Sequence, residues 1–182
     1  QIALSLPALS HRDERRFTLH LLNVILGANA SSRLFQEMRE KRGLCYSVSS
    51  HWLSLNDGGA LGISAGLDRR NLEKSLRLIL AQFDLLCKKP VGTAELRRAK
   101  EYTIGSNRMA LERSSSQNAR LGGALLSQGK IVDIETINES IRAVTSDDIL
   151  AVAREILNPS RLTIAVVGPN PDEPMLKKLL AT

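Results

Sequence analysis

The chain has 182 residues, of which 43% are apolar and 24% are charged, as in an ordinary globular domain. Aromatic residues make up only 3%, so aliphatic side chains must build the core, which favours helices over a β-sandwich. The net charge of +6 comes from scattered basic pairs between acids, with no aromatic-basic motif, which argues against a nucleic-acid partner.

The first part of the chain is predicted to alternate between strands and helices. The opening segment IALSLP alternates apolar and polar side chains, which predicts a half-buried strand that its proline ends. Helices are expected at about 13–27 and 32–42, where apolar residues recur at helical spacing. Strands follow at about 44–53 and 60–67, joined by the sequence NDGG, which is typical of a β-hairpin turn.

Two long helices are predicted after the hairpin. Apolar residues between Leu72 and Leu86 form one stripe, and Pro90 ends that helix. Thr93 is a candidate cap for the next helix, in which Gly105 or the serine run 114–116 is expected to cause a break or kink.

The last part of the chain is predicted to hold a capped helix, a strand and a short terminal helix. Thr145 and Asp148 have the spacing of a capping box, and the helix that they begin is expected to stop before Pro159. Residues 162–167 (LTIAVV) form a nearly continuous apolar run, which is typical of a strand. Pro171 is expected to introduce the terminal helix.

This order of elements predicts an α+β fold, a two-layer sandwich in which helices cover one side of one mostly antiparallel sheet. Residues 1–182 are expected to form a single domain. Because the chain opens on Gln1 inside an apparent strand and lacks an initiator methionine, we expect it to be a fragment of a longer protein. No apolar run reaches the roughly 18 residues of a membrane span, so no membrane span is expected.

The sequence does not predict a self-contained catalytic site. A zinc peptidase of the inverted kind needs the motif H-x-x-E-H on a helix. The chain has only His11, His20 and His51, and Arg15 stands where a motif beginning at His11 needs its second histidine. The two cysteines lie 42 positions apart, match no metal-ligand spacing and are expected to be buried free thiols.

Arg39 and Tyr46 are the candidate functional residues. Gly43 can end the second helix in the left-handed conformation, so that the chain enters the next strand at once. The end of the helix and the start of the strand are then adjacent. A guanidinium and a phenol at that place could donate hydrogen bonds to a peptide carbonyl or to a developing oxyanion.

Both residues also have a purely structural interpretation. Strict alternation along the strand puts Tyr46 on one face with Val48 and Trp52, so its ring could belong to the core. Arg39 could pair with Glu37 or Glu40 on the surface.

Nearly the whole chain resembles the second, non-zinc half of pitrilysin-type zinc metallopeptidases, a family that includes insulinase-like and mitochondrial-processing-peptidase-like enzymes. The most specific part is the run REKRGLCY, which begins at Arg39 and ends at Tyr46. In that family two related α+β halves close around an unfolded peptide, and the first half brings the inverted zinc motif. The second half contributes an arginine and a tyrosine, which match Arg39 and Tyr46 at the same spacing of seven.

The resemblance implies that Arg39 holds the substrate backbone and Tyr46 supports the tetrahedral intermediate. It implies the substrate-binding half of a zinc metalloendopeptidase that hydrolyses peptides in a closed chamber. Zinc is then expected in an N-terminal half, on the same chain or on a heterodimer partner, with no cofactor in this fragment, which alone should be inactive. The alternative is a non-catalytic scaffold, assembly or regulatory subunit of the same fold.

Overall fold

The computed structural model describes residues 1–169 and 173–180. In chain order its elements are β1 (Ile2–Ala8), α1 (Arg16–Leu26), the π-helix η1 (Phe35–Glu40), β2 (Cys45–Ser54), β3 (Gly59–Leu67), the 3₁₀ turn η2 (Arg69–Asn71), α2 (Leu72–Lys88), α3 (Thr93–Leu111), α4 (Ser114–Gln128), α5 (Ile134–Ala143), α6 (Ser146–Ile156), the 3₁₀ turn η3 (Pro159–Arg161), β4 (Thr163–Val166) and α7 (Glu173–Leu180). The predicted α+β class is confirmed.

The four strands form one antiparallel sheet in the order β2-β3-β1-β4. β1 pairs with β3 over its whole length, but with β4 only from Ile2 to Ser5. The prediction that the first strand ends at Pro7 is wrong, because Pro7 still pairs with Ala60 of β3. It lies beyond the last β4 partner, and the free edge there tolerates a residue without a backbone N–H.

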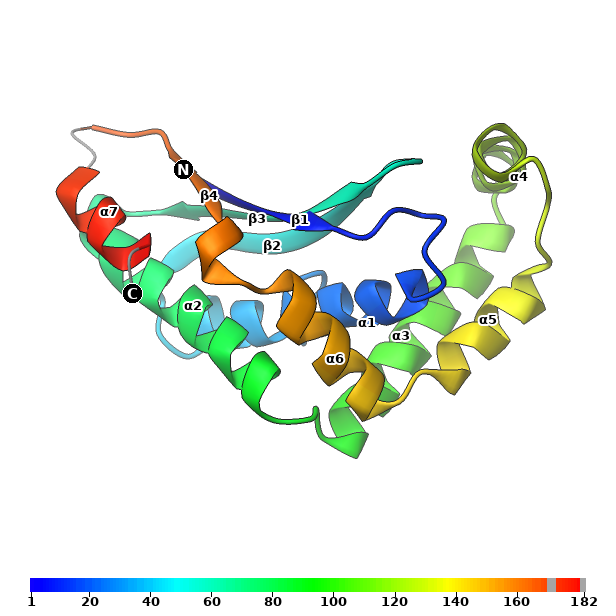
Figure 1. Cartoon of the computed structure of the whole chain (residues 1–182), viewed down its shortest axis with the longest axis horizontal. Helices are drawn as coiled ribbons and strands as arrows, with labels where there is room; N and C mark the ends of the chain where they lie inside the picture. The colour runs from blue at the N-terminus through cyan, green and yellow to red at the C-terminus, as the bar shows by residue number, and fades with distance from the viewer. Residues whose placement is uncertain (170–172, 181–182) are drawn as a thin grey trace.

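Helices cover one face of this sheet and leave the other face open (Figure 1). α1 lies directly under the sheet, and eight of its 11 residues are buried. Most of the surface of α1 is buried, because β2 packs against one side of it and α3, α5 and α6 pack against its other sides. The ends of the molecule are formed by α4 and α7.

The central helices follow the predicted pattern with three differences. α2 buries the expected stripe, which consists of Leu72, Leu76, Ile79, Phe83 and Leu86. α3 begins at Thr93 without a side-chain cap and continues through Gly105. The expected break comes after Leu111, directly before the serine run 114–116, which begins α4. The helix α5 was not separated by the sequence patterns.

The capping box of α6 is confirmed. The backbone N–H of Asp148 donates to Oγ1 of Thr145 at 3.1 Å, and the N–H of Thr145 donates to the Asp148 carboxylate at 2.8 Å. The predicted role of Pro171 lies outside the described residues, while α7 begins at Glu173. In the described part of the chain, the helices are too short or too polar to cross a membrane.

Candidate functional site

Arg39 lies on a π-helix, which is wider than the α-helix predicted for this segment. The N–H of Lys41 donates to the carbonyl of Gln36, five residues back, at 3.0 Å. Met38 is fully buried and fixes the helix to the core, whereas the Arg39 side chain is 46% exposed. Its guanidinium lies over the ring of Phe35, 4.9 Å from the ring centre. Single π-helical turns often mark functional sites.

The turn after η1 returns the chain directly to the sheet. Gly43 has a φ of +58°, the left-handed conformation expected of it, and its N–H donates to the carbonyl of Arg39 at 3.1 Å. The N–H of Leu44 donates to the carbonyl of Met38 at 2.8 Å, and the Asn71 side chain donates to the carbonyl of Leu44 at 3.0 Å. These bonds hold the start of β2 beside the end of η1.

Tyr46 is the extra residue of a β-bulge at the start of β2. Cys45 pairs with Leu67 and Ser47 pairs with Gly66, so Tyr46 has no partner on β3. The interpretation of Tyr46 as a core residue is wrong, because the residue is 87% exposed. The bulge shifts the alternation of the strand by one residue, so that Cys45 faces the core and Tyr46 faces solvent.

The acids around Arg39 leave most of its hydrogen-bonding capacity unused. Glu37 binds Lys41, with 2.6 Å between Nζ and Oε1, and also binds Arg42, and these contacts lower the pKa of its carboxyl. Arg39 does approach Glu40, but Nε and Oε1 are 3.9 Å apart and both side chains are about half exposed. Such a long surface ion pair contributes little.

The charge of Arg39 reaches the strand that carries Tyr46. Burial raises the pKa of the Cys45 thiol, and the positive charge of Arg39 partly opposes this shift. Cys45 directly precedes Tyr46, whose hydroxyl forms no hydrogen bond with any described residue. The π-helix and the bulge therefore present two donor side chains to solvent from neighbouring segments of the chain.

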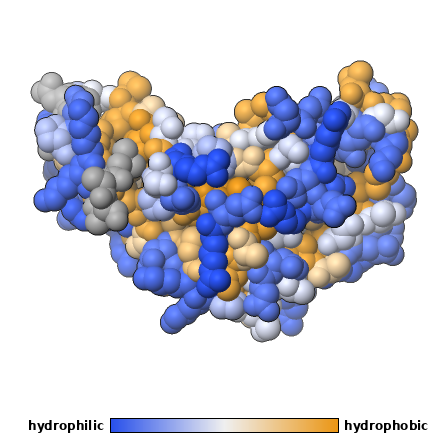
Figure 2. Space-filling model, viewed as in Figure 1, coloured by the Kyte–Doolittle hydropathy of each residue, from blue (hydrophilic) through white to orange (hydrophobic). Residues whose placement is uncertain are grey.

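The uncovered face of the sheet is hollowed and carries mostly small side chains. A hollow of about 360 Å³ lies over all four strands and is lined mainly by alanine, serine, glycine and threonine. The imidazole ring of His51 lies against Gly62, where an added Cβ would come within 2.4 Å of Nε2. Figure 2 shows the surface sinking between the two raised ends of the molecule. An extended chain could therefore lie on this face.

The residues that the structure describes do not fit a catalytic zinc ion. His11 lies 3.3 Å from the carbonyl of Ser127, His20 is half-buried in α1, where burial lowers its pKa, and His51 lies on the open sheet face. Over residues 1–169 and 173–180, no three His, Cys, Asp or Glu side chains form a group that could hold a metal. Arg15, at the place of the missing histidine, binds acids instead.

Neither cysteine is a candidate nucleophile. Cys45 is buried and Cys87 is half-buried, and both are free thiols, so the prediction is confirmed for Cys45 and only partly for Cys87. The Cys87 thiol donates to the carbonyl of Ala153 at 3.4 Å. Burial raises the pKa of both thiols, which disfavours the reactive thiolate.

A family profile described as the peptidase M16 inactive domain matches residues 1–102. The match covers more than half of the chain and includes η1, the turn at Gly43 and the bulge at Tyr46.

Curated relatives match nearly the whole chain. An uncharacterized zinc protease of Streptomyces coelicolor is 36% identical over 172 residues, which are 94% of this chain and 37% of the relative. An uncharacterized zinc protease of Bacillus subtilis is 31% identical over 173 residues, which are 95% of this chain and 42% of the relative. The chain thus spans about two fifths of the length of these relatives.

The fold also matches a solved structure. The peptidase M16 inactive domain from Pseudomonas fluorescens aligns with a TM-score of 0.74 at 24% identity, over 93% of this chain and 42% of that chain. At this identity the likeness concerns the fold.

Proposed function

The chain belongs to the family of the peptidase M16 inactive domain, and from that premise we propose that it is the substrate-binding second half of a zinc metalloendopeptidase. The relatives are called zinc proteases, and the chain spans about two fifths of their length. A half that carries the zinc motif H-x-x-E-H would then complete the active site, either on the same chain or as a separate partner. Residues 1–182 would be one half of that enzyme.

The observation that carries this proposal is the placement of Arg39 and Tyr46. Each lies on a local departure from regular structure, a π-helix and a β-bulge, and each is exposed with donors that the protein leaves unused. Core packing requires neither irregularity. Arg39 would donate to a backbone carbonyl of the peptide, and Tyr46 would donate to the oxyanion of the tetrahedral intermediate.

The open face of the sheet supports a role in enclosing the peptide. Its small side chains leave a hollow of about 360 Å³, and Ser47, next to Tyr46, belongs to the exposed side of the same strand. A zinc half that closed over this face would trap an extended peptide between the two halves. Closure would also exclude water from the reacting carbonyl, which strengthens hydrogen bonds from Arg39 and Tyr46.

The scaffold or regulatory alternative is not favoured, because the relatives are called zinc proteases. An exposed arginine and an exposed tyrosine with unused hydrogen-bond donors also have no evident task in a purely structural subunit.

Reconstitution of the two halves tests the proposal. The chain and the zinc half of the same protein are produced separately, and hydrolysis of an unfolded peptide is measured with each alone and with both. We expect activity only with both halves, because each would supply part of one active site. Hydrolysis at the full rate by the zinc half alone would contradict the proposal.

The Arg39→Gln variant tests the substrate-binding role in the same assay. Loss of a backbone contact that is present in both the substrate complex and the transition state raises KM, by about tenfold, with a smaller change in kcat. Arg161→Gln is the matched control, since Arg161 is exposed and, among the described residues, forms no ion pair. A KM for Arg39→Gln equal to that of the control would show that Arg39 does not hold the substrate.

A further inference from the structure

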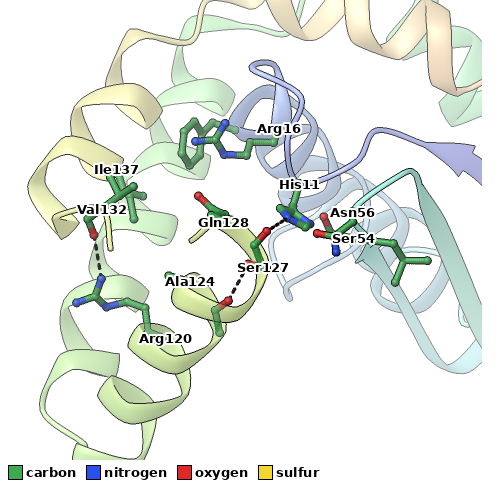
Figure 3. A pocket seen from close by; sticks show the side chains of 13 residues that line it. His11, Arg16, Ser54, Asn56, Arg120, Ala124, Ser127, Gln128, Val132 and Ile137 are labelled. Carbon is green, nitrogen blue, oxygen red and sulfur yellow. Dashed lines mark hydrogen bonds between the residues drawn. The ribbon is translucent and has the colours of Figure 1, made fainter. Parts of the chain in front are cut away.

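A cavity of about 560 Å³ lies at the other end of β2 from Tyr46. Its walls are the turn before α1, the β2–β3 hairpin, α4 and the segment that leads into α5 (Figure 3). Figure 3 shows His11 beside Ser54 and Asn56 of the hairpin, and Arg120 of α4 pointing toward Val132. Neither Arg39 nor Tyr46 lines it.

The cavity is lined by two arginines and by no described acid. Arg16 and Arg120 contribute to its wall, beside the imidazole of His11, and no described aspartate or glutamate does. The N–H groups of Arg16 and Arg120 donate to backbone carbonyls, those of Asp13 at 3.3 Å and of Val132 at 3.1 Å. Neither guanidinium is bound to a carboxylate in the described structure.

This arrangement differs from that of the other half-buried arginine. Three of the arginines are half-buried, namely Arg16, Arg33 and Arg120, and the remaining ones are exposed. Arg33 forms a two-bond ion pair with Glu95, with both distances 2.8 Å. Among the described residues, Arg16 and Arg120 form no such ion pair. Cζ of Arg16 lies 4.4 Å from the centre of the Phe17 ring, and the charge of Arg16 helps to lower the pKa of the Asp13 carboxyl. Both guanidinium groups are partly removed from water, so an anion in the cavity would stabilise them.

Two polar atoms of the cavity wall also lack protein partners. Nε of Arg120 and Oγ of Ser54 are buried and make no hydrogen bond within the described residues. Only two further side-chain atoms of the described protein share this state, on Ser32 and Ser75, and neither of these residues lines the cavity. Unused hydrogen-bonding capacity is therefore concentrated at this wall.

The remaining wall is apolar, which indicates an organic ligand. Its apolar residues are Phe17, Leu55, Ala124, Val132 and Ile137. The volume is in the range of cavities that enclose organic ligands, about 300–1,000 Å³. A small inorganic anion would leave these apolar side chains facing water, whereas an anion with an apolar body would cover them.

We propose that this cavity binds an organic carboxylate, whose charge is attracted by Arg16 and Arg120 and whose apolar body packs between Phe17 and Ile137. The free carboxyl end of an apolar peptide and a free aliphatic acid share this chemistry. The site lies apart from Arg39 and Tyr46, and it does not depend on the zinc half.

Ligand binding would also fix α4 to the rest of the molecule. None of the residues of α4 is buried, and contacts across the cavity such as the pair His11–Ser127, at 3.3 Å, connect it to the turn before α1. A ligand that contacts both Arg16 on α1 and Arg120 on α4 would connect these two helices by additional contacts. Amide hydrogen exchange in α4 should therefore slow when the site is filled.

Fluorescence of Trp52, the single tryptophan of the chain, provides the binding assay. Trp52 lines an adjoining hollow together with His11, Arg16 and Phe17. The chain is titrated with acetyl-leucyl-leucine, with its C-terminal amide and with decanoate, and α4 exchange is measured with and without each probe. We expect saturable binding of the free carboxylate and about tenfold weaker binding of the amide, because only the carboxylate pairs with arginine.

The two acids distinguish the sources of the ligand. Tighter binding of acetyl-leucyl-leucine supports a peptide end, and equal or tighter binding of decanoate supports a free acid. Equal binding of the dipeptide and its amide, or no saturable binding of either acid, would overturn the proposal.

Three variants locate the site. Arg16→Gln and Arg120→Gln should each weaken binding by about tenfold, because each removes one cation from the cavity. Gly123→Leu keeps every charge but fills the cavity, since an added Cβ at Gly123 meets no atom within 4 Å, and it should abolish binding. Arg161→Gln should bind as the unmodified chain does. If Arg120→Gln does not fold, unchanged binding in both Arg16→Gln and Gly123→Leu still overturns the proposal.

Discussion

Gly43 sets the backbone conformation on which the position of Tyr46 depends. Its φ of +58° takes the chain from η1 to β2 within the few residues between Arg39 and Cys45. An added Cβ would meet no atom within 4 Å, so a side chain at Gly43 is opposed by backbone strain and not by a clash.

Exchange of this glycine for alanine should destabilise the protein. Gly43→Ala forces a Cβ into the left-handed region and should lower the free energy of unfolding by about 1 kcal/mol. Gly105→Ala is the matched comparison, because that site is equally open but lies inside α3, where alanine should raise stability by about 0.5–1 kcal/mol. Urea unfolding of both variants gives the two values. Equal changes of the same sign would show that the turn imposes no strain.

The exposure of Tyr46 could not be predicted from its neighbours in sequence. Alternation along β2 places it toward the core, and only the pairing of Cys45 and Ser47 with β3, about 20 positions further on, shows the bulge. The position of Arg39 near the end of a helix could be predicted, because Gly43 is a local signal for that end. Arg16 and Arg120 are 104 positions apart, so no sequence pattern predicts that they line one cavity.

Whole elements were predicted well wherever the signal was local. The stripe of α2 and the capping box of α6 are encoded within a few turns, and both appear as expected. Of the two break points expected in this helix, the serine run 114–116 follows the break, whereas Gly105 does not interrupt α3, because a helix of 19 residues that packs against α1 outweighs one unfavourable glycine. Pro7 lies within a strand because β4 is too short to reach it, which the sequence of β1 does not indicate.

The contribution of the N-terminal cap of α6 to stability can be tested by its dependence on pH. Thr145→Ala removes the hydrogen bond to the N–H of Asp148 and should lower the free energy of unfolding by about 1 kcal/mol at pH 7. The hydrogen bond from the Thr145 side chain lowers the pKa of Asp148. Its carboxylate therefore stabilises the fold above its unfolded pKa of about 3.9, and this contribution is lost as the pH falls through the lower folded value.

The difference between Thr145→Ala and the unmodified chain should accordingly shrink in acid. Thr93→Ala is the control, since Thr93 begins α3 without a side-chain cap and its loss should change stability by less than about 0.5 kcal/mol. The stability of both variants is measured by thermal unfolding at pH 7 and at a series of lower pH values. A cost for Thr145→Ala that does not change with pH would contradict this interpretation of the cap.

The whole molecule has one covered and one open side. Helices bury the inner face of the sheet, and the outer face remains a hollow floor of small side chains between α4 and α7 (Figures 1 and 2). In the proposed enzyme the zinc half would face this open side. In that arrangement the corner formed by η1 and the bulge of β2 would meet the peptide, and the cavity proposed to bind a carboxylate lies at the other end of β2.

The most direct test of this account is the kcat of Tyr46→Phe in the complete two-half enzyme. If Tyr46 donates a hydrogen bond to the oxyanion, its loss should lower kcat by about 100- to 1,000-fold and change KM little. Tyr102→Phe is the matched control, because Tyr102 is the only other tyrosine of the chain and is 48% exposed on α3. A kcat for Tyr46→Phe that equals that of Tyr102→Phe would contradict the proposed role of the tyrosine.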